Sequence, residues 1–359
     1  MVKNRKYKKD IRDIILCNKD ALAEQILEKQ MNNLPKLQKH YKQLDLQKCR
    51  QDIIYHISYL AEAVALNSEI LFLEYVRWLK HLFLGLDIPL DQLIVNFEII
   101  DSVLAEKLDT EPSLDIINSL LYKGRKILLE ETNELTSFLK KETPYYLLCN
   151  AYMESLLNGN RVVSNELILN KVKDGTTVKD IYLHVFEPVQ KEIGRLWQLG
   201  KISVAQEHYC SSVTQSLMAQ LYPMFLNSGT NRYKCITTCI GNELHEIGIR
   251  MVADLLEMDN WNTYHLGANT PNDSLLKTII EKQIDLLGVS VTMTYHLKQL
   301  EELIKDIRKL DKTGKIKIMV GGYPFNIDNQ LWEKIGADGT ARQGEEAVKQ
   351  ANRLIRKKV

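Results

Sequence analysis

The sequence has little of what marks membrane, secreted or nucleic-acid-binding proteins. No apolar run reaches the roughly 18 residues of a membrane-spanning helix, and no secretion signal opens the chain. The six cysteines lack the spacing of a metal site or a disulfide framework. A formal net charge of +1 creates no overall field that would attract nucleic acid. We therefore expect a soluble, cytoplasmic protein with reduced thiols, no membrane contact and no direct binding of nucleic acid.

The amino-terminal part of the sequence predicts a short tail followed by a helical domain. The 359 residues are enough for two or three domains. Basic residues gather only between Lys3 and Lys9, and a terminal charge run of this kind is typical of a disordered tail, here residues 1–19. Between residues 20 and 143 the apolar residues follow helical spacing, which indicates a helical domain for sensing or dimerisation.

Residues 147–227 predict a second helical unit, a four-helix cap. One long helix is expected over residues 177–199, with a kink at Pro188 because proline lacks the amide hydrogen that a helix uses. Ser203 then opens the next helix, and Gln206 three positions later completes a capping box.

From residue 231 to 359 the periodicity changes to short apolar or β-branched runs separated by amphipathic helices. These runs cover residues 235–240, 261–266, 286–291 and 316–320, with a fifth short strand near 339–340. Such alternation predicts a doubly wound, parallel five-stranded sheet of the Rossmann or flavodoxin type. The expected fold class of the whole chain is therefore α/β plus all-α.

A histidine follows the first predicted strand, at the edge of the sheet where such folds bind ligands. His245 has an acid, Glu243, two residues before it and Gly248 three residues after it. A neutral imidazole there could ligate a transition metal, with Glu243 orienting the ring and Gly248 admitting a bulky group to the backbone. Taken alone, the pattern also fits a surface histidine at a helix start.

Hydroxyls and glycines end two further strands. Ser290 and Thr292 close the third predicted strand, and Gly321 and Gly322 close the fourth. Each pair alone is ordinary turn chemistry. Together with His245 they describe a deep slot between strand ends, into which a heterocycle with a nucleotide-like tail could slide.

The stretch from Gly241 to Gly248, with Ser290-Val291-Thr292 and Gly321-Gly322, resembles a cobalamin-binding domain in the base-off, His-on mode. The resemblance implies that His245 is the lower cobalt ligand and that the displaced dimethylbenzimidazole tail enters the slot. The family more often has aspartate where this chain has Glu243. The residues that we predict to contact cobalamin here are Glu243, Leu244, Gly248, Ser290, Thr292, Gly321, Gly322 and Tyr323.

The cap carries a second resemblance, to cobalamin-dependent light sensors that include the light-responsive repressors. It rests on Gly194-Arg195-Leu196-Trp197 followed by Glu207-His208. The resemblance implies adenosylcobalamin, with Trp197 against the adenosyl group and Glu207 and His208 beside it. The repressors carry a histidine where this chain has Gln198, so the same bis-histidine photoproduct cannot form. Individually, these residues also fit core packing and a solvated helix start.

The first helical domain resembles, on fewer residues, the amino-terminal region of photocobilins, which bind biliverdin close to cobalamin. The resemblance implies a bilin site, and we assign His56 and Tyr75 to it because a linear tetrapyrrole needs aromatic walls and a polar group. A core histidine in a dimerisation bundle is the alternative.

These resemblances predict a light sensor without enzymatic activity. It would lose the adenosyl group on illumination and then change its homo-oligomeric state, with a dimer favoured, or its binding to a downstream signalling protein. The alternative is a corrinoid carrier protein for methyl transfer, because carriers share the histidine loop, the Ser-x-Thr element and a helical cap. A mutase subunit fits less well, since no substrate-binding barrel is present.

Overall fold

The structure is a computed structural model that describes residues 2–33, 43–108, 111–130, 133–226 and 233–356. The chain divides into two compact units, Met1–Thr132 and Asn133–Val359. Across the described ranges, no helix is both long enough and apolar enough to cross a membrane.

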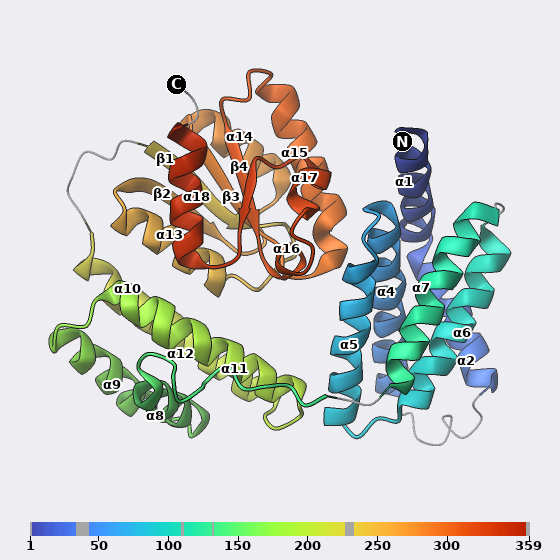
Figure 1. Ribbon diagram of the computed structural model, residues 1–359, viewed down its shortest axis with the longest axis horizontal. Helices are drawn as coiled ribbons and strands as arrows, with labels where there is room; N and C mark the ends of the chain where they lie inside the picture. Colours follow the sequence, from blue (N-terminus) through green and yellow to red (C-terminus); the bar gives the residue numbers. More distant parts are fainter. Residues whose placement is uncertain (1, 34–42, 109–110, 131–132, 227–232, 357–359) are drawn as a thin grey trace. The chain divides into compact units, whose positions relative to one another are not determined.

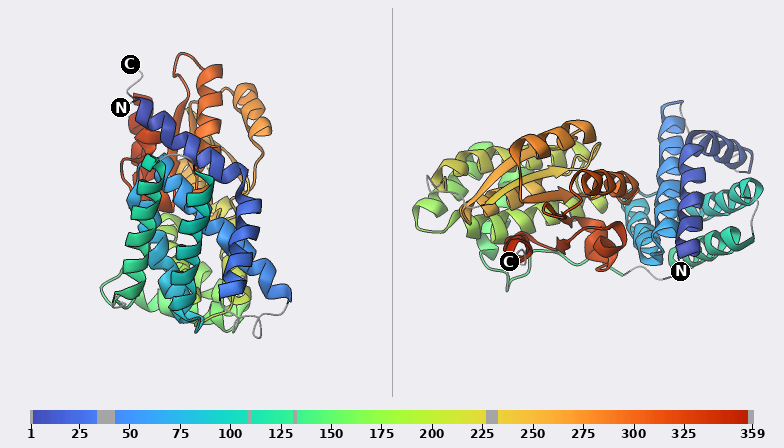
Figure 2. Two further views of the ribbon diagram at one scale, coloured as in Figure 1. Left: turned by 90° about the vertical axis from the view of Figure 1, so that its right-hand side faces the viewer. Right: turned by 90° about the horizontal axis from the view of Figure 1, so that it is seen from above.

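Unit 1 is a helical bundle, as predicted. Helix α4 packs against α1 and α2, and α7 packs against α5 and α6 (Figure 1; left panel of Figure 2). Apolar side chains from α4, α5 and α6, such as Ile57, Phe72 and Phe97, are fully buried between them. The helices of its described part are α1 (Val2–Cys17), α2 (Lys19–Asn33), α4 (Gln43–Ala65), α5 (Glu69–Gly85), α6 (Leu90–Lys107) and α7 (Glu111–Leu129).

The prediction of a disordered tail over residues 1–19 is wrong for the described residues. Val2–Cys17 forms helix α1, in which Ile11 and Ile15 are buried. These two side chains lie one turn apart and therefore share the face that packs on α4. Arg12 on the same helix donates to the buried Glu62 at 3.3 Å. Burial of this apolar face explains why a lysine-rich segment is helical.

The cap in unit 2 has the four helical segments that were predicted. They are α8 (Tyr146–Leu157), α9 (Arg161–Lys173), a continuous helix made of α10 (Val178–Ile181), η1 (Tyr182–Phe186) and α11 (Glu187–Gln198), and α12 (Val204–Leu221). The long helix contains a π-helical turn, Tyr182–Phe186, which ends two residues before Pro188. Pro188 itself lies in the first turn of α11. The capping box of Ser203 and Gln206 is confirmed.

The boundary between the units lies at residue 132 rather than at residue 143. The reason is a pair of charged side chains on α11. Arg195 donates to the carbonyl of Leu135 at 3.0 Å, and Glu192 accepts the amide of Phe138 at 2.9 Å. The segment after residue 132 is thereby fixed to the cap.

The rest of unit 2 is a five-stranded sheet in the order β2-β1-β3-β4-β5, with every pairing parallel, which confirms the predicted fold. Helices α13 and α18 pack on one face, and α14 and α15 lie on the other (Figures 1 and 2). The strands are β1 (Tyr233–Cys239), β2 (Trp261–Gly267), β3 (Leu286–Ser290), β4 (Lys317–Gly321) and β5 (Gly339–Ala341). The helices are α13 (Ile247–Met258), α14 (Asn272–Lys282), α15 (Leu297–Leu310), α16 (Tyr323–Ile327), α17 (Leu331–Ile335) and α18 (Gly344–Arg356).

The cap packs against α13, the helix that follows the predicted cofactor loop. Tyr182 in the π-helical turn donates to Asp254 at 2.9 Å, and Tyr222 donates to Glu257 at 3.1 Å. Met251 of α13 belongs to the hydrophobic core of the cap. These contacts hold the cap along α13.

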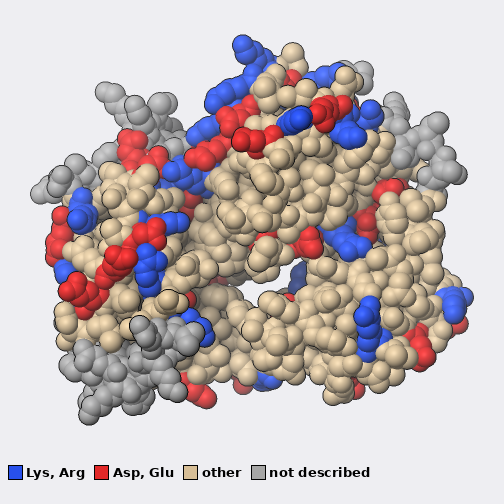
Figure 3. Space-filling view, turned by 180° about the vertical axis from the view of Figure 1, so that it is seen from behind, with Lys and Arg blue, Asp and Glu red and all other residues tan. Residues whose placement is uncertain are grey.

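One face of the molecule carries both acidic and basic side chains. On the face shown in Figure 3, acidic and basic side chains alternate, with no extended area of one sign among the coloured residues. This distribution agrees with the near-zero net charge of the sequence.

Candidate functional site

The strand order places a ligand-binding crevice at the carboxyl ends of β1 and β3. The chain leaves β1 towards β2 on one side and crosses to β3 on the other, and open parallel sheets bind ligands at such a switch point. In register, Cys239 of β1 lies beside Ser290 of β3, which lies beside Gly321 of β4. The sheet thus brings together three of the predicted site segments that are far apart in sequence.

The loop between β1 and α13 holds His245 in one orientation. The Nδ1 atom of His245 lies 2.5 Å from Oε1 of Glu243, and the carboxylate requires that this nitrogen carry the hydrogen. The second oxygen of Glu243 accepts the amides of Thr292 and Met293, each at 2.9 Å. Glu243 is 1% exposed, whereas the His245 side chain is 61% exposed. The arrangement leaves Nε2 of His245 as the nitrogen available to a metal.

Electrostatics favour a charged Glu243. Burial alone raises the pKa of its carboxyl, but hydrogen bonds from His245, His296 and the Met293 amide outweigh burial and hold the pKa well below its usual range. The hydrogen bond to Glu243 raises the pKa of His245, against a smaller opposing effect of burial. Glu243 therefore remains an acceptor that fixes the tautomer of His245.

His296 belongs to this network, although the sequence analysis did not identify it. It is 7% exposed, its Nδ1 lies 3.4 Å from Oε2 of Glu243, and its ring meets Tyr295 edge-on. The residue follows Ser290-Val291-Thr292 closely, so its position after the third strand was the available signal. Spacing alone did not show that it turns back towards Glu243.

The glycines of the predicted slot have different roles. Gly322 has φ +107 and ψ −179, a backbone conformation essentially restricted to glycine, and a Cβ there would lie 1.9 Å from the carbonyl oxygen of Val291. A Cβ on Gly321 would lie 3.3 Å from the Ala341 carbonyl oxygen. Gly248 is exposed, and a Cβ there would have nothing within 4 Å. Gly322 is needed by the fold itself, whereas Gly248 leaves open space beside the His245 loop.

The remaining predicted residues of the sheet lie around this loop at different exposures. Leu244, next to His245, is 73% exposed, and Tyr323 at the start of α16 is 47% exposed. Ser290 and Thr292 are half-buried. Leu244 and Tyr323 are large apolar side chains open to solvent, as expected of surfaces that a ligand would cover.

The cap supplies the predicted upper part of the site. Trp197 is half-buried at the end of α11. Glu207 accepts the hydroxyl of Ser211 at 2.8 Å, and the exposed His208 lies 3.5 Å from the Glu207 carboxylate. The hydrogen bond from His245 to Glu243 is the main cause that raises the pKa of His245, and the charge of Glu207 adds to it.

The predicted bilin residues of unit 1 lie together in a filled core. His56 Nδ1 lies 2.7 Å from the Tyr75 hydroxyl, and both side chains are buried. Tyr75 stacks on Tyr59 with ring centroids 3.7 Å apart, and Phe97 meets the His56 ring edge-on. Burial lowers the pKa of His56 to about 3. The bilin assignment stays a prediction.

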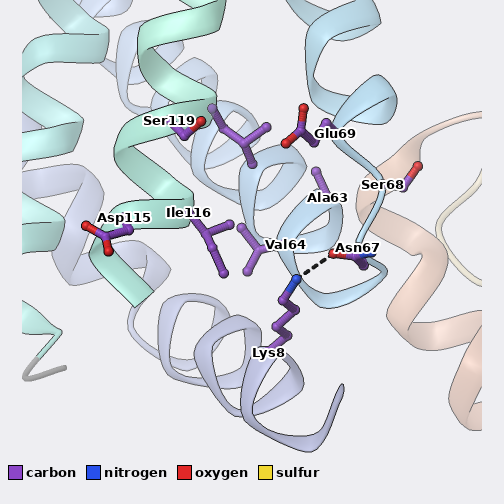
Figure 4. A pocket seen from close by; sticks show the side chains of 10 residues that line it. Lys8, Ala63, Val64, Asn67, Ser68, Glu69, Asp115, Ile116 and Ser119 are labelled. Carbon is purple, nitrogen blue, oxygen red and sulfur yellow. Dashed lines mark hydrogen bonds between the residues drawn. The ribbon is translucent and has the colours of Figure 1, made fainter. Parts of the chain in front are cut away.

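A cavity of about 280 Å³ lies elsewhere in unit 1 (Figure 4). Lys8, Asn67 and Asp115 are among its lining residues, and Lys8 donates to Asn67 across it. Neither His56 nor Tyr75 lines this cavity. It is therefore not the predicted bilin site.

The residues around His245 fit a metal that brings its own macrocycle. Within the described ranges, no three side chains of His, Cys, Asp or Glu gather as a metal site. A single imidazole whose Nδ1 is fixed by Glu243 can supply one protein ligand through Nε2, and a corrin ring would supply the other nitrogen ligands. The open space at Gly248 and the exposed Leu244 suit a bulky cofactor.

Both parts of unit 2 match known domains. Residues 233–352, which contain the sheet, match a family model described as a B12 binding domain. Residues 148–222, which contain the cap, match a second model with the same description.

Curated proteins and a solved structure resemble the same region. The chain is 26% identical to the dimethylamine corrinoid protein of Methanosarcina barkeri over 167 residues, 46% of this chain and 77% of that protein. It is 21% identical to a corrinoid protein of Desulfitobacterium hafniense over 215 residues, 58% of this chain and 98% of that protein. The structure of the monomethylamine corrinoid protein of Methanosarcina barkeri covers 58% of this chain and 99% of its own, with a TM-score of 0.53 and 22% identity, and shares the fold.

Proposed function

We propose that this cobalamin-binding protein is a corrinoid carrier that passes a methyl group between partner enzymes. The proposal is supported by the similarity to corrinoid proteins for dimethylamine and monomethylamine, and by the match of both cap and sheet to B12 binding domains. The partners would be methyltransferases, and the carrier itself would catalyse no reaction alone. This reading replaces the light sensor as the main interpretation, because the similar proteins are corrinoid proteins.

The observation that carries the proposal is the His245–Glu243 pair at the switch point of the sheet. Bound cobalamin would supply a cobalt atom that accepts and releases the methyl group. His245 would hold that cobalt from below through Nε2, while Glu243 accepts the Nδ1 hydrogen and fixes the tautomer that leaves Nε2 for the metal. The amides of Thr292 and Met293 fix Glu243 in turn, so the ligand is oriented before the cofactor binds.

The cap would exclude water from the upper face of bound cobalamin. A displacement of the cap would give partner enzymes access to that face. Trp197 offers a large rigid surface for this role, and Glu207 and His208 offer polar groups. The displaced tail of the cofactor would lie along Ser290 and the Gly321-Gly322 turn, as the resemblance implies.

Methyl transfer in the dark tests the proposal. The protein is loaded with hydroxocobalamin, reduced, and mixed with mono- or dimethylamine and a methyltransferase specific for each amine. The visible spectrum should change to that of methylcobalamin. His245→Ala should reduce the change strongly, and His184→Ala, at a half-buried cap histidine, should not. No methylation with either amine would contradict the carrier assignment for these substrates.

A light sensor is the second candidate, and two observations favour it. Trp197 and Glu207 lie on consecutive cap helices, as adenosyl recognition would need. Unit 1 also precedes both matched segments, so a helical bundle with the buried His56–Tyr75 pair remains unexplained by methyl carriage. This candidate predicts adenosylcobalamin, biliverdin in unit 1 and a signalling partner. With Gln198 after Trp197, water, His208 or another group would become the upper ligand after illumination.

Adenosylcobalamin separates the candidates. Protein mixed with it, with and without biliverdin, is followed by absorption and size-exclusion chromatography before and after green light. Photoconversion with a shifted elution volume would establish the light sensor, and a long-wavelength band would reveal a bound bilin. Bound cobalamin without a structural change would leave the carrier as the better assignment.

A further inference from the structure

Glu246 links the His245 loop to the cap. It follows His245 directly, and its Oε1 accepts the side-chain amide of Gln215 on cap helix α12 at 3.2 Å. Its Oε2 accepts the backbone amide of Ala268, after β2, at 2.8 Å. A Cβ on Gly267 would lie 3.0 Å from this oxygen, so glycine permits the close approach. Both oxygens of Glu246 thus have partners, one in the cap and one in the sheet domain.

The helix that carries Gln215 is an integral part of the cap. The side chains of Cys210, Val213 and Leu217 on α12 are buried in the cap core. Glu207 lies two turns earlier on the same helix. Because α12 is packed into the cap core, a displacement of the cap as a unit would carry Gln215 away from Glu246.

We propose that Gln215 and Glu246 are positioning residues that couple the seating of the cap to the loop that holds His245. With the cap seated, Glu246 is restrained on both sides and the loop is rigid. With the cap displaced, Glu246 loses the Gln215 partner, and the adjacent His245 loses one restraint. The inference rests on the proposed function only for the place of cobalamin between cap and loop. Because coupling is reciprocal, the state of the lower ligand would also bias the cap.

Hydrogen exchange of the cofactor-free, full-length protein tests the contact. Gln215→Ala removes the cap partner of Glu246. Gln220→Ala is the matched control, because Gln220 lies on the same helix and donates only within it, to the Ser216 carbonyl at 3.3 Å. We expect the peptides that contain residues 241–246 and Ala268 to exchange roughly tenfold faster in Gln215→Ala, as for loss of a hydrogen bond to a charged group. Equal exchange in Gln215→Ala and wild type would overturn the proposal.

Two variants of Glu246 itself measure the effect of both hydrogen bonds that its carboxylate accepts. Glu246→Ala removes the bonds to Gln215 and to the Ala268 amide, so exchange at Ala268 should rise further than in Gln215→Ala. Glu246→Gln keeps one acceptor oxygen and should give an intermediate rate. Rates in Glu246→Ala and Glu246→Gln that equal those of wild type would mean that the carboxylate restrains nothing.

Dissociation of hydroxocobalamin measures the coupling in the loaded protein. Gln215→Ala should speed dissociation by roughly fivefold when His245 is present, and by much less in the His245→Ala background. The same factor in both backgrounds would show that Gln215 acts without the lower ligand. Hydroxocobalamin needs neither methyl transfer nor light, so failure of the carrier function leaves this outcome readable. If the protein bound no hydroxocobalamin, the proposed function would be wrong. Hydrogen exchange of the cofactor-free protein would still test whether Gln215 restrains the His245 loop through Glu246.

Discussion

His56 in unit 1 and His245 in unit 2 each have Nδ1 held by a neighbouring oxygen, yet their environments are opposite. His56 lies 2.7 Å from the Tyr75 hydroxyl and is 4% exposed, and burial lowers its pKa to about 3. His245 lies 2.5 Å from a carboxylate oxygen of Glu243, its side chain is 61% exposed, and its pKa is raised. The two histidines therefore differ in access to Nε2 and not in whether Nδ1 has a partner, and only His245 has an exposed side chain that a metal could reach.

The partner also differs in charge. Tyr75 is neutral and is stacked between Tyr59 and Trp78, so it completes an apolar core. Glu243 is anionic and is held by backbone amides of the neighbouring strand end. Only the second arrangement orients an imidazole towards solvent and keeps it basic enough to bind a metal.

The substitution with the largest expected effect on the stability of unit 2 is Gly322→Ala. A Cβ at 1.9 Å from the Val291 carbonyl oxygen cannot be accommodated without moving the backbone where β3 and β4 end. We expect a loss of more than about 4 kcal/mol in the free energy of unfolding of unit 2. Urea denaturation followed by circular dichroism measures it.

Gly321→Ala is the matched control for this substitution. Its Cβ would meet the Ala341 carbonyl oxygen at 3.3 Å, a contact that small shifts relieve. A similar loss of stability in both variants would contradict the special role of Gly322.

The second largest effect is expected from acid, which should destabilise unit 1 through His56. The folded pKa of His56 lies below the unfolded value of 6.5, so its contribution to stability is complete above pH 6.5. As pH falls from 6.5 towards 3, the unfolded chain binds the proton first, and unit 1 should lose about 4 kcal/mol through this residue. Hydrogen exchange of α4, corrected for intrinsic rates, should show this loss in wild type. The same pH dependence in His56→Leu would contradict it.

Glu243→Gln sharpens the comparison by giving His245 a neutral partner, as His56 has. The amide cannot accept all the hydrogen bonds that the carboxylate accepts from His245, Thr292 and Met293. We expect hydroxocobalamin to bind roughly 10- to 100-fold more weakly in an absorbance titration. Glu302→Gln, at an exposed position of α15, is the control. Unchanged affinity in Glu243→Gln would mean that the carboxylate does not support the ligand.

Gly248→Ala has the smallest effect expected and separates folding from binding. The new Cβ meets nothing within 4 Å, and alanine favours helices, so the free protein should gain up to about 1 kcal/mol of stability. The same methyl group would occupy the space assigned to the corrin and should weaken binding. A variant that is more stable and binds cobalamin normally would place the corrin elsewhere.

The sheet could be predicted because its signals are local and continuous. Buried parallel strands appear as apolar runs, and those at 286–291 and 316–320 coincide with β3 and β4 to within one residue. The capping box at Ser203 depends on residues three positions apart. In contrast, helix α1 depends on the burial of Ile11 against α4, a tertiary contact that the basic residues conceal.

The part of the site that a single loop supplies could be predicted from the sequence. Contacts between residues that are far apart in the sequence could not. His245 and Glu243 are neighbours in sequence, and their contact follows from the loop. The approach of His296 to Glu243, and of Gln215 to Glu246, joins segments that only the folded sheet and cap bring together. The role of a single residue such as His56 could not be assigned, because its chemistry depends on how deeply the fold buries it.

We propose above that Nε2 of His245 is the lower ligand of bound cobalt. The most direct test is electron paramagnetic resonance of the Co(II) form, bound to protein made with ordinary or ¹⁵N-labelled histidine. The account predicts that the nitrogen superhyperfine pattern changes from triplets to doublets with the label, and that His245→Ala abolishes this change. Triplets that persist with labelled histidine would show that the dimethylbenzimidazole remains bound to cobalt, and would contradict the account.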